Sequence, residues 1–199
     1  MSTSRTPARI LCVVGARPNF MKIAPIMRAF ADPQYTLSAT LLHTGQHYDA
    51  AMKLALFEQL QIPEPDIDLG VGSGSHAVQT AEIMKRFEPV LDDLKPRAVL
   101  VVGDVNSTIA CALVAGKKGV AVIHVEAGLR SGDRAMPEEI NRLVTDAIPH
   151  WFFTTSEFAN ANLRRAGVSD DCIFFVGNTM IDTLLANLDR LRPPPFWND

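Results

Sequence analysis

Apolar residues along the chain fall into short, nearly continuous runs rich in valine, isoleucine and leucine. Seven segments follow this pattern, the third with a glycine-rich end: RILCVVG (9–15), YTLSATLLHTG (35–45), IDLGVGSGS (67–75), AVLVVG (98–103), VAVIHVEA (120–127), HWFFTTS (150–156) and CIFFVGN (172–178). Runs of this kind, without strict polar alternation, are typical of strands buried on both faces of a sheet. The pattern therefore predicts about seven buried strands.

The segments between these runs carry apolar residues at the spacing of an amphipathic helix. They cover residues 20–31, 50–62, 76–94, 106–119, 137–148, 157–167 and 179–191. The first follows a loop, ARPN (16–19), and is interrupted only by Pro25. Strands that alternate with helices pair in parallel and are covered by helices on both faces. We therefore expect the α/β class, with a doubly wound, mainly parallel sheet of about seven strands.

Length and composition fit one globular domain. The chain has 199 residues, 47% of them hydrophobic, and a net charge of −3 with both signs interspersed. This composition is enough for a sizeable core, and it provides no basic patch that would indicate nucleic acid as a partner. We expect one domain over residues 1–191. The proline-rich tail RPPPFWND (192–199) is typical of the start of a linker, so we expect a further segment after Asp199.

Two further features concern cellular location. The N-terminal segment MSTSRTPARI lacks the apolar stretch of a signal peptide, and no apolar run approaches the roughly 20 residues that span a bilayer. The three cysteines, Cys12, Cys111 and Cys172, are far apart and lie in apolar contexts, which predicts reduced, buried thiols instead of a disulfide or metal framework. We therefore expect a cytoplasmic protein with no membrane partner.

Polar residues gather directly after the predicted strands, where ligands bind in open α/β sheets. In chain order they are Arg17, Asn19, Lys22, His43, Gln46, His47, Asp104, Glu126, Arg130, Asp133, Glu138 and Arg142. Most have a structural explanation when taken singly, because Asp104 and Asn106 can cap the next helix and Pro137 with two glutamates is an ordinary helix start. Glu126 is explained less well, since it ends a buried strand and is followed by Ala-Gly.

The sequence gives little support for a cofactor or a metal. GVGSGSH (70–76) opens a helix and is able to hold an anion on backbone amides, but it does not match GxGxxG and follows the third strand instead of the first. The first loop, GARPN (15–19), has one glycine where a dinucleotide fingerprint needs three. His43 and His47 straddle a strand end, which disfavours a shared metal ion. We therefore expect no cofactor and no metal.

Six motifs, at their order and spacing, resemble the UDP-N-acetylglucosamine 2-epimerase family. They are GARPNFMKIAP (15–25), HTGQHYD (43–49), GDVNST (103–108), HVEAGLRS (124–131), MPEEINR (136–142) and GNTMIDTLL (177–185). The resemblance implies the N-terminal, Rossmann-like half of a two-domain GT-B-type enzyme, with the active site between the domains. In the family the second domain supplies a catalytic histidine and the groups that hold uridine and pyrophosphate. The 199-residue chain alone is therefore expected to be incomplete and inactive.

The resemblance also implies a reaction and its residues. Family members interconvert UDP-N-acetylglucosamine (UDP-GlcNAc) and UDP-N-acetylmannosamine (UDP-ManNAc) by eliminating UDP to give 2-acetamidoglucal and adding it back. Carried over by motif, the catalytic carboxylates are Asp104, Glu126 and Glu138, and either of the first two is a candidate for the base at C2. The substrate-binding residues are Arg17, Lys22, Gln46, His47, Arg130 and Arg142. The implied partners are UDP-GlcNAc and, at full length, a second copy of the chain.

Three alternative functions stay open. A hydrolysing relative would release free N-acetylmannosamine and UDP from the same intermediate. A GT-B glycosyltransferase fits less well, because three acidic strand-end motifs suit elimination better than transfer. A non-catalytic sugar-nucleotide-binding fragment is compatible with the length of the chain. One motif also departs from the family: Tyr48 and Asp49 follow QH, where many members carry a basic and an acidic residue, so the resemblance does not extend to an activating second UDP-GlcNAc site.

Overall fold

A computed structural model describes residues 8–45 and 56–190. Its seven strands pair in parallel in the order β3-β2-β1-β4-β5-β6-β7. They are β1 (Ala8–Val14), β2 (Leu37–His43), β3 (Ile67–Asp68), β4 (Ala98–Val102), β5 (Ala121–Ala127), β6 (Trp151–Thr154) and β7 (Ile173–Phe175). The strand order runs outward from β1 in both directions, which confirms the doubly wound sheet expected from the sequence.

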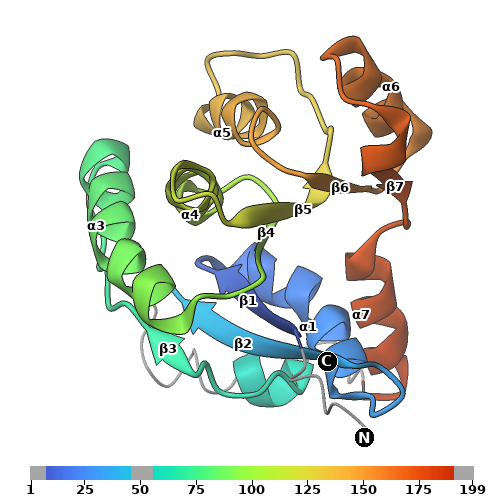
Figure 1. The fold of residues 1–199 in the computed structure, drawn as a ribbon. Helices are drawn as coiled ribbons and strands as arrows, with labels where there is room; N and C mark the ends of the chain where they lie inside the picture. The colour runs from blue at the N-terminus through green and yellow to red at the C-terminus, as the bar shows by residue number, and fades with distance from the viewer. Residues whose placement is uncertain (1–7, 46–55, 191–199) are drawn as a thin grey trace, which may run out of the picture.

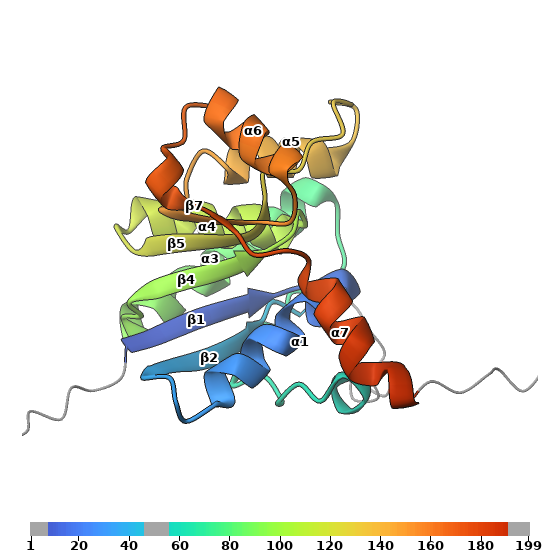
Figure 2. The same ribbon diagram turned by 90° about the vertical axis from the view of Figure 1, so that its right-hand side faces the viewer.

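Helices cover both faces of this sheet (Figures 1 and 2). The labelled α-helices are α1 (Arg17–Ala31), α3 (His76–Leu94), α4 (Asn106–Lys117), α5 (Pro137–Thr145), α6 (Glu157–Arg165) and α7 (Thr179–Asn187), and residues 56–60 are also helical. Helices α1 and α7 lie side by side on one face, while α3 to α6 lie on the other. In Figure 2 the strand arrows run toward the right-hand side, so the carboxyl ends of the strands share one edge of the molecule.

Two boundaries differ from those expected. Helix α1 begins at Arg17, three residues before the predicted start, because the Oδ1 atom of Asn19 accepts hydrogen bonds from the amides of Gly15 and Ala16 and thereby closes the first turn. Arg17 is therefore helical and not part of a loop. Strand β3 is only two residues long, since the amide of Gly70 donates to the Asp68 carboxylate and turns the chain.

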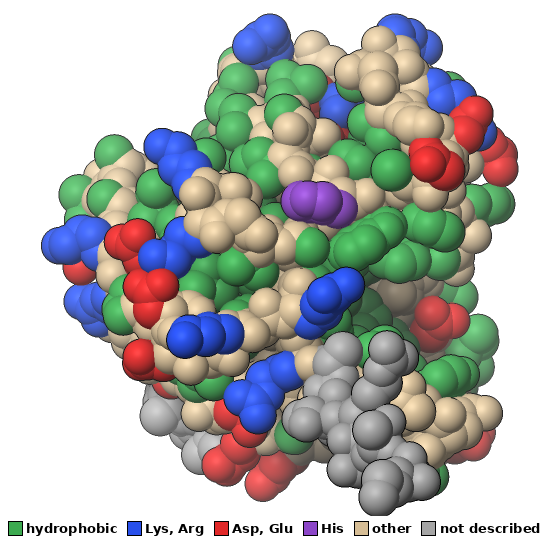
Figure 3. All heavy atoms as spheres, in the orientation of Figure 1, with side chains coloured by type: hydrophobic (Ala, Val, Ile, Leu, Met, Phe, Trp, Pro, Cys, Tyr) green, Lys and Arg blue, Asp and Glu red, His purple; other side chains and the backbone are tan. Residues whose placement is uncertain are grey.

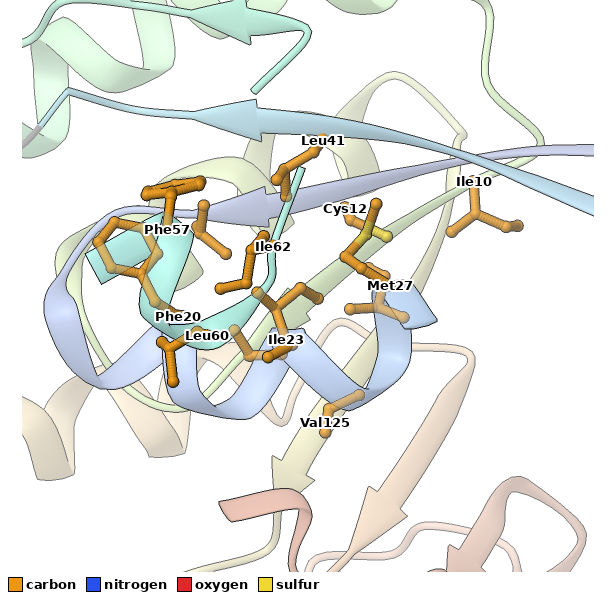
Figure 4. Packing of buried hydrophobic residues seen from close by; sticks show 14 of the residues in the cluster. Ile10, Cys12, Phe20, Ile23, Met27, Leu41, Phe57, Leu60, Ile62 and Val125 are labelled. Atoms are coloured by element: carbon orange, nitrogen blue, oxygen red, sulfur yellow. The ribbon is translucent and has the colours of Figure 1, made fainter. Parts of the chain in front are cut away.

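The core consists of two large apolar layers, one on each face of the sheet, and a small third cluster of Ala127, Phe152 and Leu163. Figure 4 shows the layer beneath α1, where Phe20 and Ile23 of the helix pack against Cys12 of β1 and Leu41 of β2. The second layer lies beneath α3 and α4 and contains Cys111. Burial raises the pKa of the Cys12 thiol to about 12 and that of Cys111 well above its usual range.

The third thiol is a correction to the sequence-based expectation. All three cysteines are free, as predicted, but Cys172 is only half-buried. It closes a short 3-10 helix (Asp170–Cys172) beside β7, the last strand of the sheet, where there is no further strand to cover it. Within the described residues, no helix is long and apolar enough to cross a membrane. The predicted linker at 192–199 lies outside the described residues.

The α1 side of the sheet is not covered over its whole width. Leu100, Val125 and Phe153 of β4, β5 and β6 line a hollow of about 420 Å³ between these strands and the α1–α7 pair. Figure 3 views the molecule from the amino ends of the strands and shows hydrophobic side chains gathered around this hollow. The strands point away from the viewer in Figure 1, so the loops that follow β1, β4 and β5 lie at the opposite edge of the molecule.

Candidate active site

The end of β1 and the end of β4 are joined by Asn19 at the point where the strand order reverses. Its Nδ2 atom donates to the carbonyl of Val102, 3.0 Å away, while its Oδ1 atom accepts from the Gly15 and Ala16 amides. Asn19 is only 1% exposed, so these bonds are shielded from water. Ligands bind at such switch points in open α/β sheets. The buried amide therefore fixes the floor of a candidate site.

Lys22 lies one helical turn after Asn19 and reaches the end of β5. Its Nζ atom is 2.7 Å from Oε1 of Glu126, and the two side chains are only 7% and 13% exposed. The low exposure matters because an ion pair attracts more strongly when water is largely excluded. The positions that the sequence identified separately are thus joined directly in the fold.

Glu126 reaches Lys22 because the backbone of β5 is irregular there. In a regular strand Glu126 would point to the same face as His124, toward α4 and α5. Instead, the register shifts between Val125 and Ala127, and Glu126 has a φ angle of 71°, in the left-handed region. A bulge of this kind re-aims a side chain, and a non-glycine residue in this region stores strain that is often found at functional sites.

Asp104 follows β4 and is paired with Arg142 of α5. Its Oδ2 atom accepts from Nε of Arg142 at 2.8 Å and lies 2.6 Å from Nη2. The Nδ2 atom of Asn141 donates to the Asp104 carbonyl at 2.9 Å, which holds the backbone as well. Helix α4 has Val105 as its N-cap and no side-chain cap. The capping explanation for Asp104 and Asn106 is therefore wrong, because both side chains bond to other elements.

Arg142 also binds Glu139, the second glutamate of the PEE sequence. Nη1 of Arg142 donates to Oε2 of Glu139 at 3.0 Å, and the amides of Ser131 and Gly132 donate to the same carboxylate at 2.9 and 3.2 Å. Burial by itself raises the pKa of Glu139, but the Ser131 amide, the Arg142 side chain and the Gly132 amide outweigh it and lower the pKa to about 2. Glu139 is thus a fixed anion that orients Arg142.

Gly103 brings the two ion pairs together. It has a φ angle of 66°, and a β-carbon placed on it would lie 2.9 Å from Nζ of Lys22. Its carbonyl oxygen is 2.8 Å from Nε2 of His124. The lysine that pairs with Glu126 therefore lies against the residue that precedes Asp104, whose positive φ angle favours glycine.

The other predicted site residues do not take part in the Lys22–Glu126 and Asp104–Arg142 pairs or lie outside the described residues. Arg17 is exposed on the first turn of α1. Glu138 is half-buried on the first turn of α5, and its side chain makes no hydrogen bond to another described residue. Arg130 does not join the Asp104–Arg142 pair, because its Nη1 atom donates to Asp146 at 2.6 Å. The predicted ligands Gln46 and His47, with their neighbours Tyr48 and Asp49, lie outside the described residues.

Four contributors to this edge were not assigned a site role from the sequence: His124, Glu139, Asn141 and Asp146. A histidine inside an otherwise apolar strand was a usable signal, since a buried polar group needs partners. The others are on α5 or at its end, where helical spacing alone does not distinguish a buried polar side chain from a solvated one. The described residues contain no group of three side chains arranged to hold a metal ion.

The pairing of carboxylates with cations at this edge indicates the kind of chemistry that the site can perform. Two carboxylates, Asp104 and Glu126, stand at the ends of neighbouring strands, each beside a cation from a different face of the sheet. Carboxylates in such settings take protons from carbon or stabilise developing positive charge, and cations stabilise a departing phosphate.

Comparison with known proteins agrees with the motifs: the family model described as UDP-N-acetylglucosamine 2-epimerase matches residues 31–196. The chain belongs to the UDP-N-acetylglucosamine 2-epimerase family.

Relatives from archaea and bacteria show how far the similarity to this family extends. The chain is 46% identical over 188 residues to a UDP-N-acetylglucosamine 2-epimerase homolog of Methanococcus maripaludis, covering 94% of this chain and 52% of that protein. It is 43% identical, also over 188 residues, to UDP-2,3-diacetamido-2,3-dideoxy-D-glucuronate 2-epimerase of Pseudomonas aeruginosa, covering 94% and 53%. The chain thus spans about half the length of the curated relatives it matches.

A solved structure of a family member superposes closely on the sheet and helices. The UDP-GlcNAc 2-epimerase of Methanocaldococcus jannaschii, crystallised in complex with UDP-GlcNAc and UDP, gives a TM-score of 0.87 at 44% identity, over 92% of this chain and 50% of that one. Such neighbours confirm the Rossmann-like, GT-B-type architecture that the motifs implied.

Proposed function

We propose that this chain forms the N-terminal half of an epimerase that interconverts UDP-GlcNAc and UDP-ManNAc. One observation carries the proposal: Asp104 and Glu126 occupy the carboxyl ends of the neighbouring strands β4 and β5, and each is paired with a cation. The M. jannaschii relative, with 44% identity, was solved with UDP-GlcNAc and UDP bound, which supports a UDP-sugar as the ligand class. The proposal needs neither cofactor nor metal.

The reaction explains why carboxylates and cations are needed together. C2 of the sugar is not next to a carbonyl, so a carbanion formed there by simple deprotonation would be unstabilised. In the proposed path a carboxylate removes the C2 proton while the bond from C1 to the UDP oxygen breaks, and the electron pair forms a C1–C2 double bond. UDP leaves as the anion. A proton then returns to the opposite face of C2, and UDP re-forms the bond to C1.

The residue roles follow from the contacts. Glu126 and Asp104 are the candidates for the C2 base, and Lys22 holds Glu126 in place close to the backbone that carries Asp104. Arg142, oriented by Glu139, positions Asp104. Glu138 is the third proposed catalytic carboxylate. The proposed substrate-binding residues are Arg17, Lys22, Gln46, His47, Arg130 and Arg142. Arg130 donates to Asp146, so it would have to exchange this bond for one to the substrate.

A second candidate substrate is favoured by one relative. The P. aeruginosa protein, 43% identical to this chain, is named for UDP-2,3-diacetamido-2,3-dideoxy-D-glucuronate. Inversion at C2 of that sugar requires the same proton removal and the same loss of UDP. The two substrates differ at C3 and C6, so an acidic sugar needs an additional cation near C6. A hydrolysing enzyme would share the first step and differ only in the fate of the glycal.

Proton NMR in deuterium oxide tests the proposal. The protein, expressed as this chain and from its complete reading frame, is incubated with UDP-GlcNAc and, separately, with UDP-2,3-diacetamido-2,3-dideoxy-D-glucuronate. UDP-ManNAc carrying deuterium at C2 is the expected product. Free N-acetylmannosamine with UDP would move the assignment to the hydrolysing reaction, and turnover of the second sugar alone would move it to that substrate. No exchange with either sugar by either form would contradict the proposal.

The assembly and location of the protein are also proposals. Met136, Ile140 and Val144 recur every four residues along α5 and are 38%, 37% and 39% exposed, which gives this helix an apolar stripe suited to a second copy of the chain. For the protein expressed from the complete reading frame, light scattering during size-exclusion chromatography should give a dimer mass, and a monomer mass for its Ile140→Glu variant. A monomeric wild type would contradict the dimer.

Free, buried Cys12 and Cys111 support a reducing, cytoplasmic location.

A further inference from the structure

His124 is a buried histidine whose two ring nitrogens both contact oxygen atoms. It lies in β5, and its side chain is 1% exposed. Nδ1 is 2.7 Å from Oδ1 of Asp146, and Nε2 is 2.8 Å from the carbonyl oxygen of Gly103. Both distances are those of well-formed hydrogen bonds. Rotating the ring by 180° would place carbon atoms in both positions, so the ring orientation is fixed by its partners.

Neither partner has a hydrogen to donate. The Gly103 oxygen is a backbone carbonyl and only accepts. Asp146 is held as a carboxylate by Arg130, whose Nη1 atom donates to its Oδ2 atom at 2.6 Å, because a guanidinium this close favours the charged form; the Gly128 amide donates to the same oxygen at 3.0 Å. A neutral imidazole has only one N–H and would leave one of the two contacts without a proton.

We propose that His124 is held as a doubly protonated imidazolium and acts as a positioning residue for the carboxylates of the site. This inference rests on the proposed function for its catalytic consequence, although not for the protonation state. The charged groups around the ring are Asp146 and, through it, Arg130. With His124 protonated, the buried Asp146 is balanced by two cations and each ring nitrogen donates one charge-assisted hydrogen bond.

The three segments held by this network are those that carry the site. Gly103 directly precedes Asp104, and Gly128 lies two residues after Glu126. Asp146 caps the carboxyl end of α5, the helix that carries Arg142. His124 thus ties the β4 turn to the end of α5, and Asp146 ties α5 to the β5 turn. Loss of either side chain should let Asp104 and Glu126 move relative to each other while leaving both carboxylates in the sequence.

Nitrogen-15 NMR of histidine-labelled protein tests the protonation state without any substrate. The chain has five histidines, and the resonance lost in His124→Gln assigns the residue. We expect two directly bonded N–H correlations for His124 at pH 7, with both nitrogens at imidazolium shifts. In Asp146→Asn the ring should become neutral, keeping the Nε2 proton that binds Gly103. A wild-type ring with only one protonated nitrogen would overturn the inference, and this result does not depend on whether the protein is an epimerase.

Kinetics test the positioning role if the wild-type protein from the complete reading frame is active. His124→Gln should lower kcat at least tenfold and change KM by less than about threefold, because the substrate contacts are retained and the geometry of the carboxylates is not. His150→Gln is the matched control, since His150 is exposed at the start of β6, and it should leave both constants unchanged. An unchanged kcat for folded His124→Gln would refute the positioning role. If that variant does not fold, the resonance that changes in Asp146→Asn assigns His124, and the NMR measurement on wild type then decides the protonation state.

Discussion

The Nζ atom of Lys22 lies 2.7 Å from Oε1 of Glu126, although 104 positions of sequence separate the two residues. The contact joins the first helix to the end of the fifth strand, next to the turn that carries Asp104. It depends on a backbone irregularity at Glu126 and on a glycine at 103, so two local departures from regular structure are both needed to form one ion pair.

The strain at Glu126 predicts an unusual preference for glycine. A left-handed backbone costs a residue with a β-carbon about 1 kcal/mol or more, and glycine avoids this cost. Glu126→Gly should therefore be about 1 kcal/mol more stable than Glu126→Ala in urea unfolding. The control is Glu82, half-buried in the interior of α3, where the alanine variant should be the more stable of the two. Equal stability of the two Glu126 variants would show that the backbone relaxes.

Removing the cation from the Lys22–Glu126 pair should destabilise the fold. Lys22→Met leaves a carboxylate of low exposure without its partner, and we expect a loss of about 3 kcal/mol in the free energy of unfolding. The control, Lys85→Met, breaks a pair with the same 2.7 Å distance to Glu82, but Lys85 is 70% exposed, so the loss should stay below about 1 kcal/mol. Adding Glu126→Gln to Lys22→Met should recover part of the loss; purely additive effects would show that the pair is not coupled.

The hydrogen bonds to Glu139 predict a stability difference that depends on pH. The folded-state pKa is about 2 against an ordinary value of 4.5, so the stabilisation is complete above pH 4.5 and is lost as the pH falls through about 2. Glu139→Gln should be less stable than wild type by about 2 kcal/mol at pH 7, with the gap narrowing below pH 4.5. Urea unfolding over this range measures it.

Glu138→Gln is the matched control for that experiment. Its carboxylate accepts no hydrogen bond from the described residues, so the change in stability should stay within about 0.5 kcal/mol at every pH. A gap between Glu139→Gln and wild type that stayed constant from pH 7 to pH 3 would contradict the assignment of Glu139 as the fixed anion beneath Arg142.

The fold could be predicted from the sequence because its signals are local and repeated. Buried parallel strands such as β4 are apolar throughout, and the helical spacing between them sets the alternation that defines the class. The start of α1 was missed because it depends on the Asn19 side chain, which acts over a few residues and resembles a loop signal. Strand β3 was overestimated because a glycine-rich extended segment does not reveal where pairing stops.

The candidate site was only partly predictable. Strand-end position identified Asp104, Glu126, Lys22 and Arg142, and the family motifs assigned them roles. The structure brings all four to one edge. The pairing of these residues depends on which helix crosses which strand end, and no sequence spacing encodes it. Glu139 was passed over because an acidic residue in a first helical turn is common, and its burial depends on the loop that folds back over it.

The most direct test of the account is the exchange of the C2 proton of UDP-GlcNAc for deuterium by single variants of the complete protein. Asp104→Asn and Glu126→Gln keep the shapes of their side chains, and each should lower the exchange rate by about a hundredfold or more while circular dichroism shows a folded protein. Asp92→Asn alters an exposed carboxylate of α3 that is paired with Lys118 at the end of α4. This variant should catalyse the exchange at the wild-type rate. Exchange near the wild-type rate in both Asp104→Asn and Glu126→Gln would contradict the assignment of this edge as the site of the chemistry.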